Sequence, residues 1–249
     1  MIMSDYFKEY GFDFDEEIIK DFCFFTDYLL SENEKYNLTS ITVPDEIIIK
    51  HYIDSVIILK YFDIPENSRI IDIGTGAGFP ALPLALIRKD LRITFLDSSN
   101  KKINFIKNAL TNLNLNSDRD LDLSRFDFYC GRAEDLCGDI KIRESYDFAL
   151  SRAVAKLNIL CELSAAFISP GGFFIAYKGK NAYDEISSAK NALKILGLKI
   201  ENITEFNLSD KIDKIENSEN KRVLVKIKKL KKTSPKYPRN FSDITKNPL

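Results

Sequence analysis

Two stretches near the start of the chain repeat apolar residues at helical spacing. Over residues 16–30 apolar side chains recur every three or four positions, at Ile18, Ile19, Phe22, Phe25 and Leu29. Residues 45–62 repeat the pattern after a Thr42-Val-Pro44 start, and a polar connection over residues 33–42 separates the two stretches. This spacing predicts two amphipathic helices. We expect residues 1–65 to form a helical cap that packs onto the domain that follows.

From Arg69 onward, short apolar runs alternate with helical stretches. The predicted strands cover residues 69–74, 92–97, 126–130, 145–150, 172–177, 198–206 and 223–229. The predicted helices cover residues 80–88, 99–115, 132–138, 155–168 and 181–196. Strands separated by helices predict right-handed βαβ units in a parallel sheet that is covered on both faces. Only a polar loop at 210–220 joins the last two strands, which predicts an antiparallel hairpin at one edge.

Three alternate glycines, Gly74, Gly76 and Gly78, follow the first predicted strand in the sequence Asp72-Ile-Gly-Thr-Gly-Ala-Gly-Phe-Pro80. Glycine permits a sharp turn with positive φ and lets a ligand approach the backbone closely. In open sheets of this kind ligands bind beyond the carboxyl ends of the strands. We therefore predict a cofactor site in this strand–loop–helix unit.

The spacing of the loop disfavours two common cofactors. A dinucleotide fingerprint requires glycine three positions after Gly76, where this chain has Phe79. A phosphate-binding P-loop ends in Gly-Lys-Ser/Thr, which this loop lacks. The form Asp-x-Gly-x-Gly-x-Gly resembles motif I of the S-adenosylmethionine-dependent methyltransferases, whose sheets also end in an antiparallel hairpin. Asp97 lies 25 positions after Asp72 at the end of the second strand, where a ribose-binding carboxylate is expected; a helix N-cap is its alternative role.

Composition narrows the possible functions. The 249 residues are 45% hydrophobic and 29% charged, as in ordinary globular proteins that bury one substantial core. We see neither a stretch of membrane-spanning length nor a signal peptide, so we expect a cytoplasmic protein. Four cysteines without C-x-x-C pairing and a single histidine predict no metal site, and reduced, mostly buried thiols.

The charge distribution suggests a polyanionic partner. The net charge is −1, yet nine basic residues and no acidic one lie between Lys221 and Arg239. A basic stripe on a nearly neutral protein is compatible with nucleic-acid contact. A solvated lysine-rich tail is the alternative interpretation.

Further basic segments follow the strand ends. They are Gly131-Arg-Ala-Glu134, Ser151-Arg-Ala-Val-Ala155 and Tyr177-Lys-Gly-Lys180. With Lys35-Tyr-Asn-Leu-Thr39, Lys50-His-Tyr-Ile-Asp-Ser55 and Pro235-Lys-Tyr-Pro-Arg239, the chain resembles one family over most of its length. The family is the bacterial guanine-N7 methyltransferases of small-subunit ribosomal RNA, long called glucose-inhibited division protein B. The resemblance implies a class I, Rossmann-like methyltransferase sheet, S-adenosylmethionine as the cofactor, and 16S ribosomal RNA or the small subunit as the partner.

The resemblance also implies roles for individual residues. Arg152 would be the catalytic residue, beside the methyl donor and the target base. The cofactor would contact Gly74, Gly76, Gly78, Phe79, Asp97, Ala133, Glu134 and Arg152. The cations that face RNA would be Arg132, Lys178 and Arg222. Residues 66–232 would form the methyltransferase domain and 233–249 a basic tail that packs on or beside it, in a protein that acts as a monomer.

The chemistry of guanine N7 suits these residues. N7 carries a free lone pair, so its methylation needs alignment and electrostatic stabilisation but no general base. Enzymes that methylate exocyclic amines usually present Asn/Asp-Pro-Pro-Tyr/Phe after the fourth strand, where this chain has Ser151-Arg-Ala-Val. Pyrimidine C5 enzymes need a nucleophilic cysteine beside proline, and none of the four cysteines has that neighbour.

Alternatives remain open at the level of sequence. The chain could methylate a small molecule or a protein, or bind the cofactor without catalysis as a ribosome-assembly protein; Phe79 disfavours a nicotinamide oxidoreductase. Arg152 could be an ion-pairing residue of its loop. We expect His51 to be a surface or hydrogen-bonded residue and Cys130 to be a packing residue. Tyr177 could stack on a base or pack within its strand.

Overall fold

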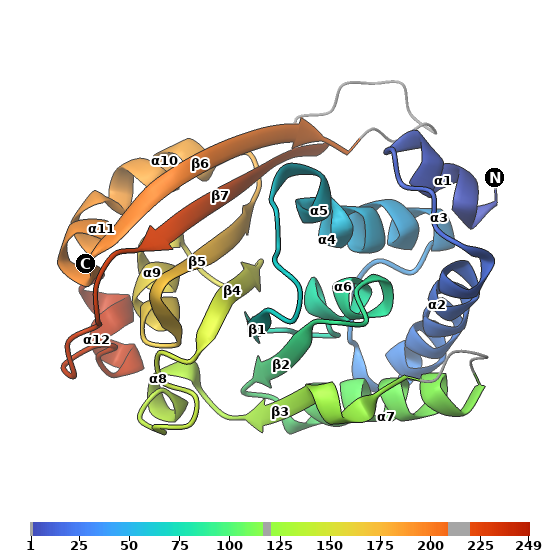
Figure 1. Ribbon diagram of the computed structural model, residues 1–249, viewed down its shortest axis with the longest axis horizontal. Helices are drawn as coiled ribbons and strands as arrows, with labels where there is room; N and C mark the ends of the chain where they lie inside the picture. Colours follow the sequence, from blue (N-terminus) through green and yellow to red (C-terminus); the bar gives the residue numbers. More distant parts are fainter. Residues whose placement is uncertain (1, 117–120, 209–219) are drawn as a thin grey trace.

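A seven-stranded mixed sheet forms the centre of the molecule (Figure 1). The computed structural model describes residues 2–116, 121–208 and 220–249, so the predicted loop at 210–220 lies almost wholly outside the described residues. The strand order is β3-β2-β1-β4-β5-β7-β6. Neighbouring strands from β3 to β5 are parallel, and β7 pairs antiparallel with both β5 and β6, which confirms the predicted fold class. The strands are β1 Arg69–Ile73, β2 Arg92–Asp97, β3 Phe126–Cys130, β4 Tyr146–Arg152, β5 Ile168–Lys178, β6 Leu198–Asn207 and β7 Lys221–Lys229.

Both faces of the central strands β1, β2 and β4 are buried, whereas much of the edge strand β6 is exposed. Side chains alternate along each strand, so neighbouring residues point to opposite faces. In β1, Ile70 belongs to one hydrophobic cluster, whereas Ile71 and Ile73 belong to another on the opposite face. The first cluster includes residues of α6 and α7, and the second includes residues of α8 to α11 and of α12 (Phe241–Lys246). The predicted helix at 181–196 is two helices that meet at Ala189. The bounds are α6 Ala81–Ile87, α7 Asn100–Asn116, a 3₁₀ turn η2 Leu123–Arg125, α8 Ala133–Leu136, α9 Leu157–Ala165, α10 Ala182–Ser188 and α11 Lys190–Leu196.

The N-terminal segment is helical, as predicted, with three differences in detail. The first predicted helix is α2, which continues to Tyr36 and ends where Asn37 adopts a left-handed conformation. The polar connection that follows it is therefore shorter than expected. The second helical stretch contains a π-helical turn, and a short helix that the sequence did not predict precedes both. The bounds are α1 Met3–Glu9, α2 Glu16–Tyr36, α3 Pro44–Ile47, π-helix η1 Ile48–Ile53, α4 Asp54–Val56 and α5 Ile58–Tyr61.

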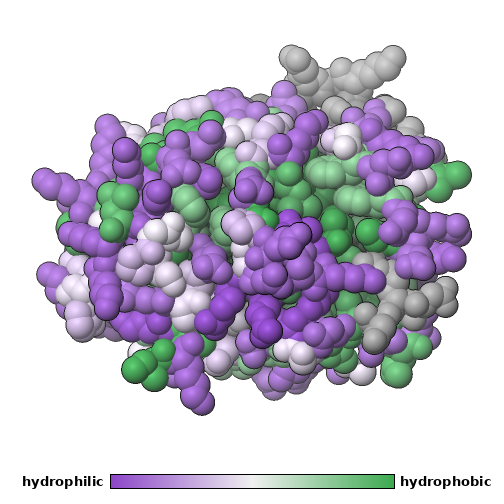
Figure 2. All heavy atoms as spheres, viewed as in Figure 1, coloured by the Kyte–Doolittle hydropathy of each residue, from purple (hydrophilic) through white to green (hydrophobic). Residues whose placement is uncertain are grey.

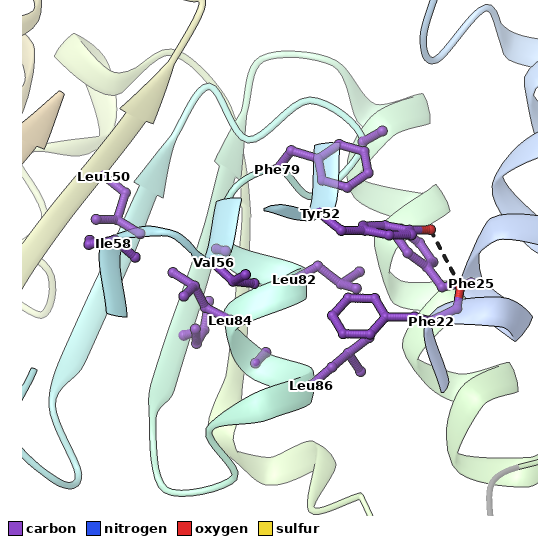
Figure 3. Close-up of a cluster of buried hydrophobic side chains, with 14 of the residues drawn as sticks. Phe22, Phe25, Tyr52, Val56, Ile58, Phe79, Leu82, Leu84, Leu86 and Leu150 are labelled. Atoms are coloured by element: carbon purple, nitrogen blue, oxygen red, sulfur yellow. Dashed lines mark hydrogen bonds between the residues drawn. The ribbon is translucent and has the colours of Figure 1, made fainter. Parts of the chain in front are cut away.

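The N-terminal helices and the sheet share one hydrophobic core (Figure 3). The Tyr52 ring lies 4.7 Å from Phe22 and 6.1 Å from Phe25 between ring centroids. Phe79, which follows the glycines of the loop, lies 5.9 Å from Phe25 and 6.0 Å from Tyr52. Aromatic pairs at such distances stabilise by about 0.5–1.5 kcal/mol beyond the area that they bury. The core therefore fixes the end of the glycine loop against the N-terminal helices.

The residues after β7, 230–249, form a C-terminal strap that packs on the second face of the sheet with α9. Its helix α12 (Phe241–Lys246), which the sequence did not predict, places Ile244 in the core with α9. Arg239 donates two hydrogen bonds of 2.8 and 2.7 Å to the carboxylate of Glu162, a fully buried residue. The ammonium of Lys229, also fully buried, lies 2.6 Å from Glu144. The division into domains at residues 65 and 232 stays a prediction.

Hydrophilic side chains cover most of the face seen in Figure 2. Throughout the described residues no helix is both long and apolar enough to cross a membrane. Cys137 and Cys161 are buried, but Cys23 and Cys130 are exposed, so the expectation of mostly buried thiols is wrong for half of them. Cys130 ends an outer strand of the parallel part of the sheet, and its position does not make it a packing residue.

Candidate active site

A cavity of about 720 Å³ opens at the carboxyl ends of β1, β4 and β5. Its volume lies within the range typical of small-molecule sites, about 300–1,000 Å³. The chain leaves β1 toward β2 on one side and reaches β4 on the other, so the cavity lies at the switch point of the sheet. Its walls come from the glycine loop, the segments 152–156 and 177–179, and two pieces of the N-terminal segment, 38–41 and 50–54.

The glycine loop (residues 74–79) turns as predicted, but its three glycines serve different purposes. All three have positive φ, of 72°, 61° and 95° along the chain. A Cβ at Gly74 would lie 2.5 Å from a methyl of Val154, and one at Gly78 would lie 3.0 Å from Leu82. A Cβ at Gly76 meets no atom of the described residues within 4 Å. The predicted room for a ligand is therefore found at Gly76, whereas the other two glycines allow close packing.

Asp97 holds this open position. One of its carboxylate oxygens accepts a 3.0 Å hydrogen bond from the Gly76 N–H, and the other accepts one of 2.9 Å from Ser99. Helix α7 begins at Asn100, so Asp97 is not its N-cap. Each oxygen retains a lone pair beyond these bonds. The carboxylate thus combines support of the loop with capacity for a ligand hydroxyl, and its contact with ribose stays a prediction.

A second carboxylate lies beneath the loop. Asp72 is fully buried, and one oxygen accepts hydrogen bonds from the Thr75 hydroxyl (2.7 Å) and the Ala81 N–H (3.3 Å). Its other oxygen has no hydrogen-bond partner among the described residues. Burial raises the pKa of Asp72 to about 7, although the hydrogen bond from Thr75 opposes the rise. The sequence indicated this residue only as the start of the glycine motif.

Arg152 reaches across the cavity to the N-terminal segment. Its Nη1 lies 2.8 Å from Asp54, and its guanidinium carbon lies 5.2 Å from the centre of the Phe79 ring. The side chain is 12% exposed. The ion pair considered as an alternative is present, and it places the guanidinium in the wall of the cavity. The catalytic role of Arg152 stays a prediction.

Two of the predicted RNA-facing cations also line the cavity, in different ways. Arg222 lies 3.5 Å from the second oxygen of Asp54, so one carboxylate faces two guanidinium groups. The ammonium of Lys178 lies 2.6 Å from the Ala155 carbonyl and 2.7 Å from Glu185, with 7% of its side chain exposed. Lys178 therefore supports the 152–156 segment and has little surface for direct RNA contact.

The remaining predicted residues lie beyond the third strand, beside Asp97 and outside the lining of the cavity. The Gly131 N–H donates a 3.1 Å hydrogen bond to the Asp97 carbonyl, which brings this segment to the loop edge. Ala133 is buried, and Glu134 is 5% exposed with one oxygen that lacks a hydrogen-bond partner among the described residues. Arg132 is 54% exposed and lies 4.6 Å over the Phe241 ring. Their contacts with cofactor and RNA stay predictions.

His51 is a site residue to which the sequence gave no role in the pocket. Its ring stacks on Phe79 with 4.4 Å between centroids and 15° between planes, and Nε2 lies 2.8 Å from the Thr39 hydroxyl. Burial, with the positive charge of Arg152, lowers the pKa of His51 to about 3. It is hydrogen-bonded, as expected, but it also forms part of the cavity wall. Its place in the Lys50–Ser55 motif was the available signal.

We predict that the His51 imidazole stays neutral between pH 8 and pH 5. Since the chain has one histidine, the proton NMR signal of its ring C2–H is unambiguous and its shift should be constant over that range. Unfolded histidine binds a proton near pH 6.5 and the folded residue near pH 3, so the free energy of unfolding should fall as the pH falls between those values. Arg152→Met should raise the pKa of His51. A titration midpoint near 6.5 in the folded protein would contradict the buried geometry.

The fold and the cavity define the class of protein. M. jannaschii TYW2 in complex with AdoMet is similar with a TM-score of 0.51 and 15% identity, over 71% of this chain and 77% of that one. P. horikoshii TYW2 in complex with MeSAdo is similar with a TM-score of 0.52 and 12% identity, over 75% of this chain and 63% of that one. Precorrin-6y C5,15-methyltransferase from Geobacter metallireducens is similar with a TM-score of 0.51 and 14% identity, over 70% of this chain and 86% of that one. The fold is that of the class I S-adenosylmethionine-dependent methyltransferases.

Within this class, the chain belongs to the GidB family, rRNA small subunit methyltransferase G, whose family model matches residues 18–213. Proteins named ribosomal RNA small subunit methyltransferase G from Clostridium kluyveri and Clostridium botulinum are each 41% identical, over 100% of this chain and 98% of their own. The one from Thermoanaerobacter pseudethanolicus is 39% identical, over 97% and 95%. The predicted family, cofactor and ribosomal RNA methyltransferase activity are confirmed.

Proposed function

We propose that the chain transfers a methyl group from S-adenosylmethionine to N7 of a guanine in 16S ribosomal RNA, in the cavity beside the glycine loop. The open space at Gly76 carries this proposal, because a backbone held by Asp97 there leaves room that any side chain would fill. Full-length similarity to small-subunit RNA methyltransferases favours this substrate. The chain would act as a monomer in the cytoplasm, where bacterial ribosomal RNA is found.

The carboxyl edge of β1, β2 and β3 would hold the cofactor. Asp97 would accept hydrogen bonds from the ribose hydroxyls, and Glu134 would bind the adenine. A buried acceptor without a partner costs about 1–3 kcal/mol. The exocyclic amine of adenine would supply the donor that the buried Glu134 oxygen lacks among the described residues. The loop residues that would frame the rest of the cofactor are Gly74, Gly76, Gly78 and Phe79.

The chain would contribute alignment to the reaction. When bound, S-adenosylmethionine supplies an electrophilic methyl group on a sulfonium. Arg152, held by Asp54, would orient the target base, and Lys178 would act through the 152–156 segment that it supports. Guanine N7 needs no deprotonation, so the engagement of both ring nitrogens of His51 in hydrogen bonds is compatible with this chemistry. Alignment of this kind contributes up to about 7–11 kcal/mol to lowering a barrier.

The RNA backbone would contact cations with exposed side chains. Five of the nine cations between residues 221 and 239 are in ion pairs with carboxylates of the chain: Lys221, Arg222, Lys226, Lys229 and Arg239. This stripe is therefore largely neutralised. Arg132 and Lys102 also face carboxylates, but at the longer distances of 4.0 Å (Glu134) and 3.7 Å (Asp97), and their side chains are 54% and 39% exposed. We propose that these two cations, with Lys156 at the cavity, carry more of the phosphate contact, and that Arg222 guides the target into the cavity.

Label transfer tests this proposal. The protein is incubated with methyl-labelled S-adenosylmethionine and small ribosomal subunits from a strain that lacks the modification. We expect label at N7 of one guanine in 16S RNA, mapped by nuclease digestion and mass spectrometry. Subunits that already carry the methyl group serve as the control and should accept no label. Cofactor binding without label in any RNA would refute the proposal and favour a non-catalytic assembly protein.

A further inference from the structure

The guanidinium of Arg152 is held by residues distant from it in the chain. Among the described residues, its hydrogen-bond acceptors all lie within the stretch 50–55. Nη1 lies 2.8 Å from a carboxylate oxygen of Asp54, 3.3 Å from the Lys50 carbonyl and 3.4 Å from both the His51 carbonyl and the Ser55 hydroxyl. Nη2 lies 3.4 Å from Nδ1 of His51. The orientation of Arg152 therefore depends on the N-terminal helices as well as on its own strand.

The π-helical turn at Ile48–Ile53 helps to gather these acceptors. A π-helix is wider than an α-helix and occurs frequently at functional sites. Here it turns two carbonyl groups and the following Asp54 and Ser55 side chains toward one guanidinium. The Tyr177 hydroxyl donates a 2.9 Å hydrogen bond to the Ser55 carbonyl and joins the same stretch to β5. The turn is thus fixed to two neighbouring strand ends of the sheet.

His51 is itself held on three sides. Arginine can only donate, so Nδ1 of His51 accepts from Arg152, and Nε2 must carry the proton that it donates to the Thr39 hydroxyl. The side-chain amide of Asn33 in turn binds the backbone of Thr39 through two hydrogen bonds, of 3.0 and 2.8 Å. The Phe79 ring covers one face of the imidazole at 4.4 Å. The imidazole has little freedom to rotate away from Arg152.

We infer that His51 is a positioning residue of the methyl transfer, an uncharged acceptor that, with Asp54, sets the plane of the Arg152 guanidinium. The inference rests on the proposed function for the reaction that Arg152 serves. Asp54 faces two guanidinium groups, so the group of three already carries a positive charge. A protonated His51 would add a second positive charge and would lose its acceptor. A neutral ring adds no charge to the group, and its lone pair on Nδ1 accepts the hydrogen bond from Arg152.

Three variants separate positioning from simple structural support. His51→Phe keeps a ring to stack on Phe79 but removes the acceptor, and His51→Gln restores an amide oxygen as acceptor. Tyr52→Phe is the control, because Tyr52 is a buried neighbour whose hydroxyl binds Thr26 and not Arg152. We expect His51→Phe to lower kcat by about 10- to 100-fold with KM for S-adenosylmethionine within about twofold, His51→Gln to recover most of kcat, and Tyr52→Phe to keep it.

Two outcomes of the measurements on these variants would overturn the inference. One is an unchanged kcat in His51→Phe. The other is that His51→Phe and Tyr52→Phe lose activity to the same extent, in proportion to an equal loss of thermal stability. Nitrogen NMR gives a readout that needs no RNA: the single histidine should show the Nε2–H tautomer, and Arg152→Met should shift Nδ1. A protonated Nδ1 would also overturn the inference. Failure of the proposed function would appear instead as wild-type protein that labels no RNA while these spectra stay as expected.

Discussion

The Gly76→Arg variant is expected to lose measurable affinity for S-adenosylmethionine. A side chain at this position enters open space in the cavity wall, where no described atom lies within 4 Å. The arginine would fill the volume meant for the ligand and disturb the Gly76 N–H that Asp97 holds. Isothermal calorimetry should show a loss of more than about 100-fold, or roughly 2.7 kcal/mol. Unchanged affinity would refute the assignment of the loop as the cofactor site.

A matched substitution controls for backbone strain. Gly76 has a φ of 61°, and a non-glycine residue in this conformation costs about 1–3 kcal/mol of stability. Gly171 has a φ of 95°, also faces open space, and lies in a different cavity, beyond the amino-terminal end of β1. Gly171→Arg should therefore lose similar stability while its affinity for S-adenosylmethionine stays that of the wild type. Equal losses of affinity in both variants would indicate general unfolding.

The Arg239→Met variant should be strongly destabilised. Glu162 is fully buried, and Arg239 supplies its charged partner through two side-chain hydrogen bonds and one backbone N–H. Removal of one partner of a buried pair leaves an uncompensated charge and costs about 3–5 kcal/mol. For a chain of this size, each kcal/mol lost from the free energy of unfolding lowers the melting temperature by about 2–4 °C. Differential scanning calorimetry measures the effect.

Lys236→Met provides the comparison for Arg239. Lys236 is exposed and lies over the Tyr237 ring in the same strap. Its replacement should change the melting temperature little, since exposed charges contribute little to stability. If RNA contact were the main role of Arg239, the two variants would have similar melting temperatures and Arg239→Met would lose RNA affinity alone. That result would support the interpretation of residues 221–239 as an RNA-binding stripe.

Local patterns were sufficient to predict the sheet. Short β-branched runs such as Ile70 to Ile73 are typical of buried parallel strands, and glycines or polar residues bound each run. All seven predicted strands are present, although β5 begins four residues early, at Ile168. The helix α12 was missed because it is short and amid polar residues, and its one buried apolar side chain, Ile244, needs α9 as a partner. Such tertiary packing leaves no periodic signal in the sequence.

The site could be predicted only in part. The glycine loop and Asp97 follow strand ends, and parallel strands bring such residues to one edge. The partners of Arg152 come from about a hundred positions earlier in the chain, and no spacing rule connects Arg152 with Asp54. The sequence also could not show that five cations of the basic stripe are in ion pairs, and the contact of this stripe with RNA stays a prediction. A run of cations shows no sign of the carboxylates that neutralise it, such as Glu144 and Glu162.

The hold of residues 50–55 on Arg152 has a genetic consequence. A random mutagenesis screen for cells with unmethylated ribosomes should recover lesions in the codons for Asn33, Thr39 and His51, far upstream of the glycine loop. The enzymes from those isolates would still bind to a column that carries immobilised S-adenosylmethionine. Enzymes with lesions at Gly76 would pass through the same column. Inherited loss of the modification would thus fall into two biochemical groups, which a single chromatographic step distinguishes.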